Sequence, residues 1–399
     1  MRHVVEEHMR QASTNTRARD SVRACQRADF LPRTVWQPSG PFFRRLDRDG
    51  PAHRTWLRIA NSASALVTEF DDEPAVERDG PGRIPTVCVP PATVMMSIAE
   101  QLVAIPGLGR VLQVGAASGY PAAFLGHALR GRSAVTCAEP RSDLARRAAE
   151  RLDEHGTGEG DVRLEHADFL GGEPCGERPW DAIVAGLALT GHMPGPLIRC
   201  ARPGAVLLVP YASDYAPDLQ VLVRFVVGLD RDRAEGRIVE HLPRHAFAQD
   251  THRLLPLPAP GPLPRDADRV TDTGLLPGGF LARTTGFPSA QFVIGLRVPH
   301  CRMTESWDRD HRLIRWTDLT PGATEPSFTE LKLAHGARRG LVYEVGPRRL
   351  WEEITRAHQW WLNLGKPPPS RFVITAYAQG EIRYALDTPM TAAAPGPPP

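Results

Sequence analysis

The sequence has almost no lysine, no long apolar run and little net charge. Only Lys332 and Lys366 are lysines, so arginine supplies nearly all of the 48 basic side chains, which 46 acidic ones balance. A net charge of +2 without a basic run gives no electrostatic footprint for nucleic acid. No segment approaches the roughly 18 apolar residues that cross a bilayer, and the first twenty residues lack the apolar centre of a signal peptide. We therefore expect a soluble, cytoplasmic protein that binds neither nucleic acid nor membrane.

The cysteines and histidines also lack the patterns of a metal or redox centre. The sequence contains no C-x-x-C and no H-E-x-x-H, and the closest histidine cluster, His241 to His245, is interrupted by Pro243. That proline disfavours a helical pair of metal ligands. We predict a surface loop there, no bound metal, and reduced, mostly buried thiols for the six cysteines.

Short apolar runs alternate with helical patterns between residues 83 and 250. The runs are RVLQVG, AVTCAEP, VRLEHAD, DAIVAG and AVLLVP, and amphipathic segments such as DLARRAAERL lie between them. This alternation predicts a parallel α/β sheet covered by helices on both faces. No helical pattern separates AVLLVP from the following VLVRFVVG. We therefore expect an antiparallel pair that closes the edge of the sheet.

A second folded region follows a proline-rich stretch, residues 251–279, which we interpret as a linker. In residues 280–390, AQFVIGLRVPHC is strand-like, and GPRRLWEEITRAHQWWLNLG predicts a helix bounded by glycine and proline. RFVITAYAQGEIRYALD predicts a hairpin that turns at Gln379-Gly380. Trp351 and Trp361 lie near the apolar stripe of the helix, which favours a core position over a peptide platform. Residues 391–399 are expected to be a disordered tail.

The segment VLQVGAASGYPAAFLGHAL has the form of a nucleotide-binding turn. Gly115 and Gly119 follow a predicted strand and open a predicted helix, where backbone can lie close to a ligand and free N–H groups are available. The dinucleotide fingerprint G-x-G-x-x-G is absent. Glu139 ends the second predicted strand, where it can accept hydrogen bonds from both ribose hydroxyls. Asp168 ends the third, where it can bind an adenine amino group. A ribose and an adenine without a phosphate cradle point to S-adenosyl-L-methionine.

The same segment resembles the protein-L-isoaspartate O-methyltransferase family, whose loop runs close to VLEIGTGSGYQAA. Gly115, Ser118, Gly119 and Tyr120 match that loop. RADFLPRTVW, RPGAVLLVP and PTVCVPPATV are similar to the family's N-terminal stretch, to its P-G-G-x-L-x-x-P strand and to the place of its T-I-S-Q-P substrate segment. The resemblance covers roughly residues 20 to 225. It implies an α/β fold, the Rossmann-like sheet of a class I S-adenosylmethionine-dependent methyltransferase, with an additional C-terminal α+β domain.

Three further segments resemble a longer branch of that family. They are LVTEFDDE, AQFVIGLRVPHC and YEVGPRRLWEEITRAHQWWLNLGKPPPSRFVIT. Members of this branch are bacterial methyltransferases encoded with ribosomally made, modified peptides, including the ATP-grasp peptide maturase and FxLD lanthipeptide systems. The resemblance implies a carboxyl O-methyltransferase that esterifies an Asp of a precursor or modified peptide, which then closes to a succinimide and hydrolyses to isoaspartate. The C-terminal domain would hold the peptide.

The resemblance also implies which residues form the site. Those implied to bind the cofactor are Gln113, Gly115, Ala117, Ser118, Gly119, Glu139, Asp168 and Phe169. Those implied to be catalytic are Cys88 and Thr86, and those implied to bind substrate are Val87, Val89 and Pro90. The sequence departs from the family where its serine falls at Cys88, where its glutamine falls at Val89, and where the central Thr-Gly of the loop falls at Ala116-Ala117. Gln113 replaces an acid that is often present and retains hydrogen-bonding capacity.

The expected organisation has five parts: residues 1–82 contributing to the substrate site, 83–250 binding the cofactor, the linker 251–279, the C-terminal domain 280–390, and the tail 391–399. Other functions remain open. They are an isoaspartyl protein-repair methyltransferase, a non-catalytic peptide-binding relative and, less favoured, a nicotinamide dehydrogenase. The oligomeric state is left open as well.

Overall fold

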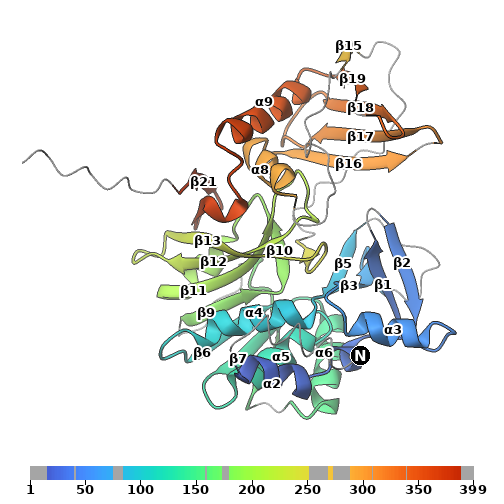
Figure 1. Ribbon diagram of the computed structural model, residues 1–399. Coiled ribbons are helices and arrows are strands. Elements are labelled where there is room, and N and C mark those ends of the chain that lie inside the picture. Colours follow the sequence, from blue (N-terminus) through green and yellow to red (C-terminus); the bar gives the residue numbers. More distant parts are fainter. Residues whose placement is uncertain are drawn as a thin grey trace, which may run out of the picture.

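The computed structural model describes residues 16–39, 42–74, 84–157, 160–172, 179–250, 268–272, 288–307, 309–337 and 339–387. The strands in these ranges form a central sheet, a smaller N-terminal sheet and a C-terminal sheet (Figure 1). Most of the expected linker and the whole expected tail lie outside the described residues. The predicted domain boundaries stay predictions.

The central sheet contains the predicted parallel strands in the order β8-β7-β6-β9-β11. Antiparallel strands continue it as β12-β13-β20-β21, and β10 and β14 pair beside β11. The bounds are β6 (Arg110–Val114), β7 (Ala134–Glu139), β8 (Val162–His166), β9 (Trp180–Ala185), β10 (Leu187–Thr190), β11 (Ala201–Ala212), β12 (Val221–Val227), β13 (Arg233–His241), β14 (Ala248–Gln249), β20 (Phe372–Tyr377) and β21 (Ile382–Leu386).

Strand β12 lies inside the central sheet, between β11 and β13. The antiparallel pairing of β11 with β12 is confirmed. The expectation that this pair closes the edge is wrong, because β13 pairs with β12 and the C-terminal hairpin β20–β21 pairs with β13. The hairpin turns at Gly380, as predicted, with φ +105°. Residues more than a hundred positions apart therefore share one sheet, a pairing that local sequence patterns do not encode.

Helices α2 (Thr16–Ala24), α4 (Ala92–Val103) and α5 (Tyr120–Leu129) pack on one another beside the sheet (Figure 1). α5 is buried over nearly its whole length, which agrees with its almost wholly apolar sequence. α6 (Ser142–Glu154) is amphipathic instead, and lies against β7 and β8 with Ala148 and Leu152 in the core. Its other positions include three arginines, Arg146, Arg147 and Arg151, and four acidic residues. α7 (Gly195–Arg199) precedes β11.

The N-terminal sheet has the order β2-β1-β3-β4, and β5 also pairs with β3. Its elements are η1 (Arg27–Phe30), β1 (Thr34–Ser39), β2 (Phe42–Asp47), α3 (His53–Ala60), β3 (Leu66–Phe70), β4 (Glu73–Pro74) and β5 (Pro85–Val89). Buried Arg27 donates hydrogen bonds to the backbone oxygens of Ser62, Ser64 and Val89 at 2.9–3.3 Å. Burial lowers the pKa of Arg27 to about 10, so it remains charged at neutral pH. This single side chain fixes the end of β5.

The C-terminal sheet has the order β15-β19-β18-β17-β16, all antiparallel. Its elements are β15 (Asp268–Asp272), α8 (Ser289–Arg297), β16 (Cys301–Trp307), β17 (His311–Asp318), β18 (Phe328–Ala334), β19 (Gly340–Val345), α9 (Leu350–Asn363) and η3 (Pro369–Arg371). The predicted helix is confirmed as α9. The strand-like interpretation of AQFVIGLRVPHC is wrong, because most of this run forms α8, buried from Ala290 to Leu296. A short apolar run that is buried on all sides has no periodicity to distinguish helix from strand.

The chemistry of the described cysteines differs from the expectation at one position. Cys25, Cys88, Cys137 and Cys301 are free and buried, as predicted, but Cys200 is disulfide-bonded, so the prediction of reduced thiols is wrong there. Among the described residues, no group of three or more His, Cys, Asp or Glu could hold a metal ion. No helix in the described ranges is both long and apolar enough to cross a membrane.

Candidate active site

The ends of β6 and β9 lie at the point where the strand order of the parallel sheet reverses. From β6 the chain continues outward to β7 and β8, whereas β9 and β11 lie on the other side. The Gly186 N–H donates to the Val114 carbonyl at 2.6 Å, and a Cβ on Gly186 would come 2.5 Å from the Gly115 oxygen. This close approach requires glycine. Open α/β sheets bind their ligands in the crevice at this position.

The loop between β6 and α5 bends sharply through three residues with positive φ. Gly115 has φ +91°, Ala117 +49° and Gly119 +82°. A Cβ on Gly119 would meet the Ala148 carbonyl oxygen at 3.2 Å, so α6 packs directly on this bend. Ala117 adopts the left-handed conformation that glycine adopts freely and alanine only at a cost. The loop therefore keeps its bend although its sequence has lost the central glycine.

Glu139, at the end of β7, fastens this loop. Its Oε2 accepts from the Ala116 N–H at 2.8 Å, and its Oε1 accepts from the Arg141 N–H at 3.0 Å. Burial raises the pKa of Glu139, an effect that these backbone hydrogen bonds oppose. Because an ionised carboxylate accepts about four hydrogen bonds, Glu139 retains capacity for a ribose hydroxyl.

Gln113, inside β6, presents a buried polar atom that lacks a partner. Its Nε2 donates to the Gly115 carbonyl at 3.0 Å. Its Oε1 is buried and accepts no hydrogen bond from any described residue. Buried acceptors in native proteins are nearly always paired. A donor from a ligand in the crevice, such as an amino group, would satisfy this oxygen.

Asp168 and Phe169 follow β8 along the same edge of the sheet. The Ala167 N–H donates to the Glu139 carbonyl at 3.2 Å, which brings the ends of β7 and β8 together. The Asp168 Oδ1 accepts from the Gly171 N–H at 2.8 Å, and Phe169 packs in the core beneath the edge. The structure thus gathers the residues predicted to bind cofactor along one edge. The contact of Asp168 with an adenine stays a prediction.

Strand β5 carries the predicted substrate segment, and its residues alternate between two sides. Val87 lines a pocket of about 40 Å³ together with Ala117 and Ser118 of the loop. Cys88 lies instead in an apolar cluster with Trp36, Val67 and Phe70, where burial raises the pKa of its thiol and keeps it neutral.

The remaining residues of the segment do not line this pocket. The Thr86 hydroxyl accepts from the Asp72 N–H at 3.0 Å. Val89 packs in the main core, and Pro90 is buried. Of this segment, Val87 is the residue that reaches the pocket, and the catalytic roles of Cys88 and Thr86 stay predictions.

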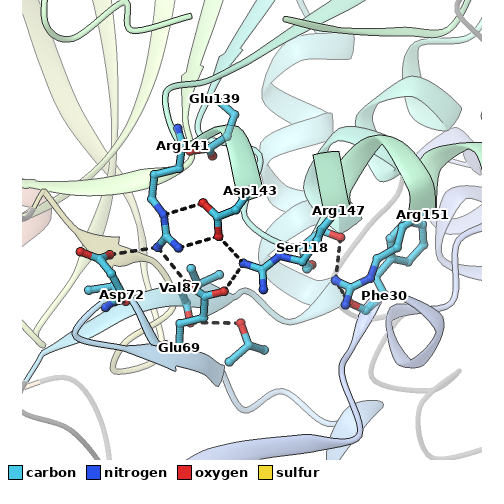
Figure 2. Close-up of polar contacts among 12 residues, drawn as sticks. Phe30, Glu69, Asp72, Val87, Ser118, Glu139, Arg141, Asp143, Arg147 and Arg151 are labelled. Atoms are coloured by element: carbon cyan, nitrogen blue, oxygen red, sulfur yellow. Dashed lines mark hydrogen bonds and ion pairs between the residues drawn. The ribbon is translucent and has the colours of Figure 1, made fainter. Parts of the chain in front are cut away.

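Sequence reasoning missed a network of charges next to the same pocket (Figure 2). Arg141 pairs with Glu69 at 2.9 Å, with Asp72 at 2.9 Å and with Asp143 at 2.8 Å. Arg147 pairs with Glu69 and, at 3.0 Å, with Asp143.

Arg151, one turn further along α6, donates to the Phe30 and Ser118 carbonyls at 2.8 and 3.3 Å. The spacing of Asp143, Arg147 and Arg151 by four residues is visible in the sequence and indicates one helix face. Glu69, from β3, pairs with Arg147, and no sequence pattern indicated that pairing.

Comparison with known proteins agrees with this geometry. Residues 74–235 match the family model of protein-L-isoaspartate(D-aspartate) O-methyltransferase (PCMT). A protein-L-isoaspartate O-methyltransferase 2 of Polaromonas sp. (strain JS666 / ATCC BAA-500) is 33% identical over 114 residues, 29% of this chain and 51% of that protein. One of Anaeromyxobacter sp. (strain Fw109-5) is 36% identical over 143 residues, 36% of this chain and 54% of that protein.

These matches span about half the length of each relative. A solved structure of a protein-L-isoaspartate O-methyltransferase covers 97% of this chain and 100% of its own, with a TM-score of 0.50 and 14% identity, which shows the fold. The family match leaves out the similar N-terminal stretch. Residues 74–235 therefore make up a protein-L-isoaspartate O-methyltransferase-like domain, and the fold is that of the class I S-adenosylmethionine-dependent methyltransferases.

Proposed function

We propose that this chain is an S-adenosyl-L-methionine-dependent carboxyl O-methyltransferase, and that it esterifies an Asp of a ribosomally made, modified peptide. The observation that carries the general activity is the loop at the crevice. Ala117 keeps the left-handed bend that its sequence disfavours, and Glu139 fastens that bend from the neighbouring strand. The family match over residues 74–235 supports the same activity.

The residues present fit an adenosine that carries an amino acid. Glu139 would accept from the ribose, and Gln113 Oε1 would accept from the amino group. When bound, S-adenosyl-L-methionine supplies a methyl group on a sulfonium; a carboxylate oxygen would bond to that methyl carbon as its bond to sulfur breaks and S-adenosyl-L-homocysteine leaves, and no base is needed. An Asp side chain with a pKa near 4 is already ionised at neutral pH. The chain therefore has to hold the carboxylate in line and exclude water, which is chiefly a matter of position.

The finer part of the proposal concerns the peptide. Residues 66–73, 290–301 and 343–375 support it, because they resemble the peptide-associated branch. Two aromatic residues of α9 are engaged within the chain: Trp351 packs against Trp316 with tilted rings whose centroids lie 5.7 Å apart, and the Trp361 indole N–H donates to the Pro367 carbonyl at 2.9 Å.

Arg348 is likewise engaged within the chain, with Asp318 and Glu353 at 2.7 Å each. A peptide held by the C-terminal domain would therefore contact surfaces other than these side chains.

Titration calorimetry with S-adenosyl-L-methionine tests the activity at its first step. We expect binding by the wild type, weaker binding by Gln113→Leu, and unchanged binding by the control Gln359→Leu, whose side chain lies exposed on α9. An absence of binding by the wild type would refute the proposed activity and favour a non-catalytic relative.

Mass spectrometry separates the two substrate classes. A modified precursor peptide should gain one methyl group and then lose methanol as the succinimide forms. If a short isoaspartyl peptide is methylated and the precursor is unchanged, the repair function holds instead, which the match to the protein-L-isoaspartate family favours as the second candidate.

A further inference from the structure

We propose that Glu69 is an internal stand-in for the substrate carboxylate. In the free protein it occupies a carboxylate-binding site formed by Arg147 and Arg141, and an acidic peptide must displace it to bind. The inference rests on the proposed function, because a carboxylate is the group that such an enzyme methylates. The inference adds two features to that function: a receptor for the substrate carboxylate, formed by Arg141 and Arg147, and the occupation of this receptor by Glu69 in the free protein.

The first observation is the way in which Glu69 is held (Figure 2). Its side chain is 4% exposed and pairs through one oxygen with Arg141, at 2.9 Å, and through the other with Arg147. Two guanidinium groups on the two oxygens of one carboxylate are the arrangement by which proteins recognise carboxylates. The structure therefore contains a carboxylate receptor that is filled by the chain itself.

The second observation is the place of this receptor. Glu69, Arg147 and Arg151 line the same small pocket as Ala117 and Ser118 of the loop and Val87 of β5. The pocket thus joins the loop proposed to hold the methyl donor to the strand proposed to hold the substrate. A carboxylate bound there lies where the acceptor of a carboxyl methyltransferase has to be. The small volume, about 40 Å³, agrees with a site that Glu69 already fills.

The third observation is the local backbone of β3. Glu69 lies opposite Val87 in the pairing of β3 with β5, and the register shifts on both sides of it. Such irregularities re-aim a side chain and are frequent beside active sites. The turn that follows contains Asp71 and Asp72, both with positive φ, +51° and +63°, which costs non-glycine residues free energy. The chain is bent at this point, next to the residue whose carboxylate enters the pocket.

The charges favour exchange over simultaneous binding. Arg141 and Arg147 both pair with Glu69 and Asp143, and Arg141 pairs also with Asp72. A second carboxylate added beside buried Glu69 would place two like charges in a site with little water, which is strongly unfavourable. If Glu69 leaves, Asp143 still holds both guanidinium groups in place, because it pairs with Arg141 and Arg147. The receptor then remains formed for the incoming anion.

The alternative is a purely structural role, in which Glu69 only holds the N-terminal sheet against α6 through its ion pairs. Under that alternative, removing its charge loosens the sheet and improves the binding of no ligand. Under the proposal, removing its charge relieves competition, so that affinity rises for ligands with a carboxylate and for no others. Affinity for a charged and a neutral version of one ligand therefore separates the two.

The probe is an amidated hexapeptide that carries one aspartate, compared with the same peptide carrying asparagine at that position, each titrated with S-adenosyl-L-homocysteine present. In Glu69→Gln we expect the charged peptide to bind about tenfold more tightly than in the wild type, as when a competing state filled about nine-tenths of the sites. The neutral peptide should bind equally to both. Adding Arg147→Gln should abolish the preference for the charged peptide.

The matched control is Glu150→Gln, which removes a carboxylate from an exposed pair with Arg146 on the same helix and should change neither affinity. If Glu69→Gln does not fold, Glu69→Asp keeps the charge on a side chain too short to reach both guanidinium groups, and should give a smaller gain in the same direction.

Equal affinities in the variants and the wild type, a gain for the neutral peptide as well, or no binding of the charged peptide to Glu69→Gln would each overturn the proposal. Calorimetry with S-adenosyl-L-methionine keeps the outcomes distinct: loss of that binding in the wild type refutes the proposed function, whereas intact binding without the charge-specific gain refutes only the stand-in role.

Discussion

Replacing Ala117 by glycine should stabilise this protein, although glycine usually destabilises. Ala117 has φ +49°, and an L-residue in the left-handed region costs about 1–2 kcal/mol. Glycine relieves that strain but gives the unfolded chain more freedom, which costs about 0.4–1 kcal/mol. The difference is a net stabilisation of about 0.5–1 kcal/mol. For a protein of this size we expect a rise in Tm of about 1–3 °C.

The neighbouring residue supplies a matched control. Ala116 is fully buried and is absent from the residues with positive φ, so Ala116→Gly loses a buried methyl group and adds unfolded-state entropy. It should destabilise the protein by about 1–2 kcal/mol. Gly119→Ala should destabilise it further, since its φ of +82° and the Ala148 carbonyl at 3.2 Å both oppose a Cβ. The same small change of side chain is thus expected to have opposite signs at adjacent positions.

Thermal and urea unfolding of the purified variants measure these differences, and calorimetry follows S-adenosyl-L-methionine. Affinity should not fall in Ala117→Gly, because the backbone N–H groups of the loop keep their directions. A loss of stability in Ala117→Gly comparable to that of Ala116→Gly would refute the reasoning, since it would mean that the left-handed bend at Ala117 is not present in the protein.

Three further perturbations follow from the site. Burial raises the folded-state pKa of Glu139 above its ordinary value of 4.5, so the folding stability that Glu139 contributes is lost as pH rises through that raised value. Affinity for S-adenosyl-L-methionine has the opposite dependence and falls as pH drops through the same value, because the protonated carboxyl accepts fewer hydrogen bonds. In calorimetry, Glu139→Gln should bind S-adenosyl-L-methionine more weakly and without this pH dependence. Arg27→Met leaves three buried carbonyls without their donor and should cost about 3 kcal/mol in urea unfolding, whereas Arg23→Met, from an exposed pair with Asp20, should change stability by less than about 0.5 kcal/mol. Cys88→Ser places a hydroxyl in an apolar cluster and should lower the free energy of unfolding by about 1–3 kcal/mol; a restored or increased methyltransferase activity without that loss would place Cys88 at the substrate instead.

The parallel sheet was predictable because each of its strands is a short apolar run bounded by charge, glycine or proline. The same pattern predicted that the loop, Glu139 and Asp168 lie at one edge of the sheet, because the carboxyl ends of parallel strands all lie at the same edge. Helix α9 was predictable from its apolar stripe and its punctuation. In each of these cases the decisive information lies within about twenty consecutive residues.

The features that could not be predicted depend on pairs distant in sequence. Glu69 meets Arg147 across 78 positions, and β13 meets β20 across more than a hundred. Nothing local in RIVEH of β13 or VITAY of β20 indicates which strand edge either run joins. The error at α8 has a different cause: burial on every side removes the contrast between faces on which periodicity depends.

The alternation of side chains along β5 changes how Cys88, the clearest departure from the family pattern, is to be interpreted. The family's serine falls at Cys88, which in sequence alone points to altered substrate binding. Because side chains alternate across a strand, Val87 reaches the pocket while Cys88 enters the cluster of Trp36 and Phe70. Glu69, directly opposite Val87, brings the charge to that pocket. Residues that bind the proposed substrate are therefore to be sought at Glu69, Arg147 and Val87 before Cys88.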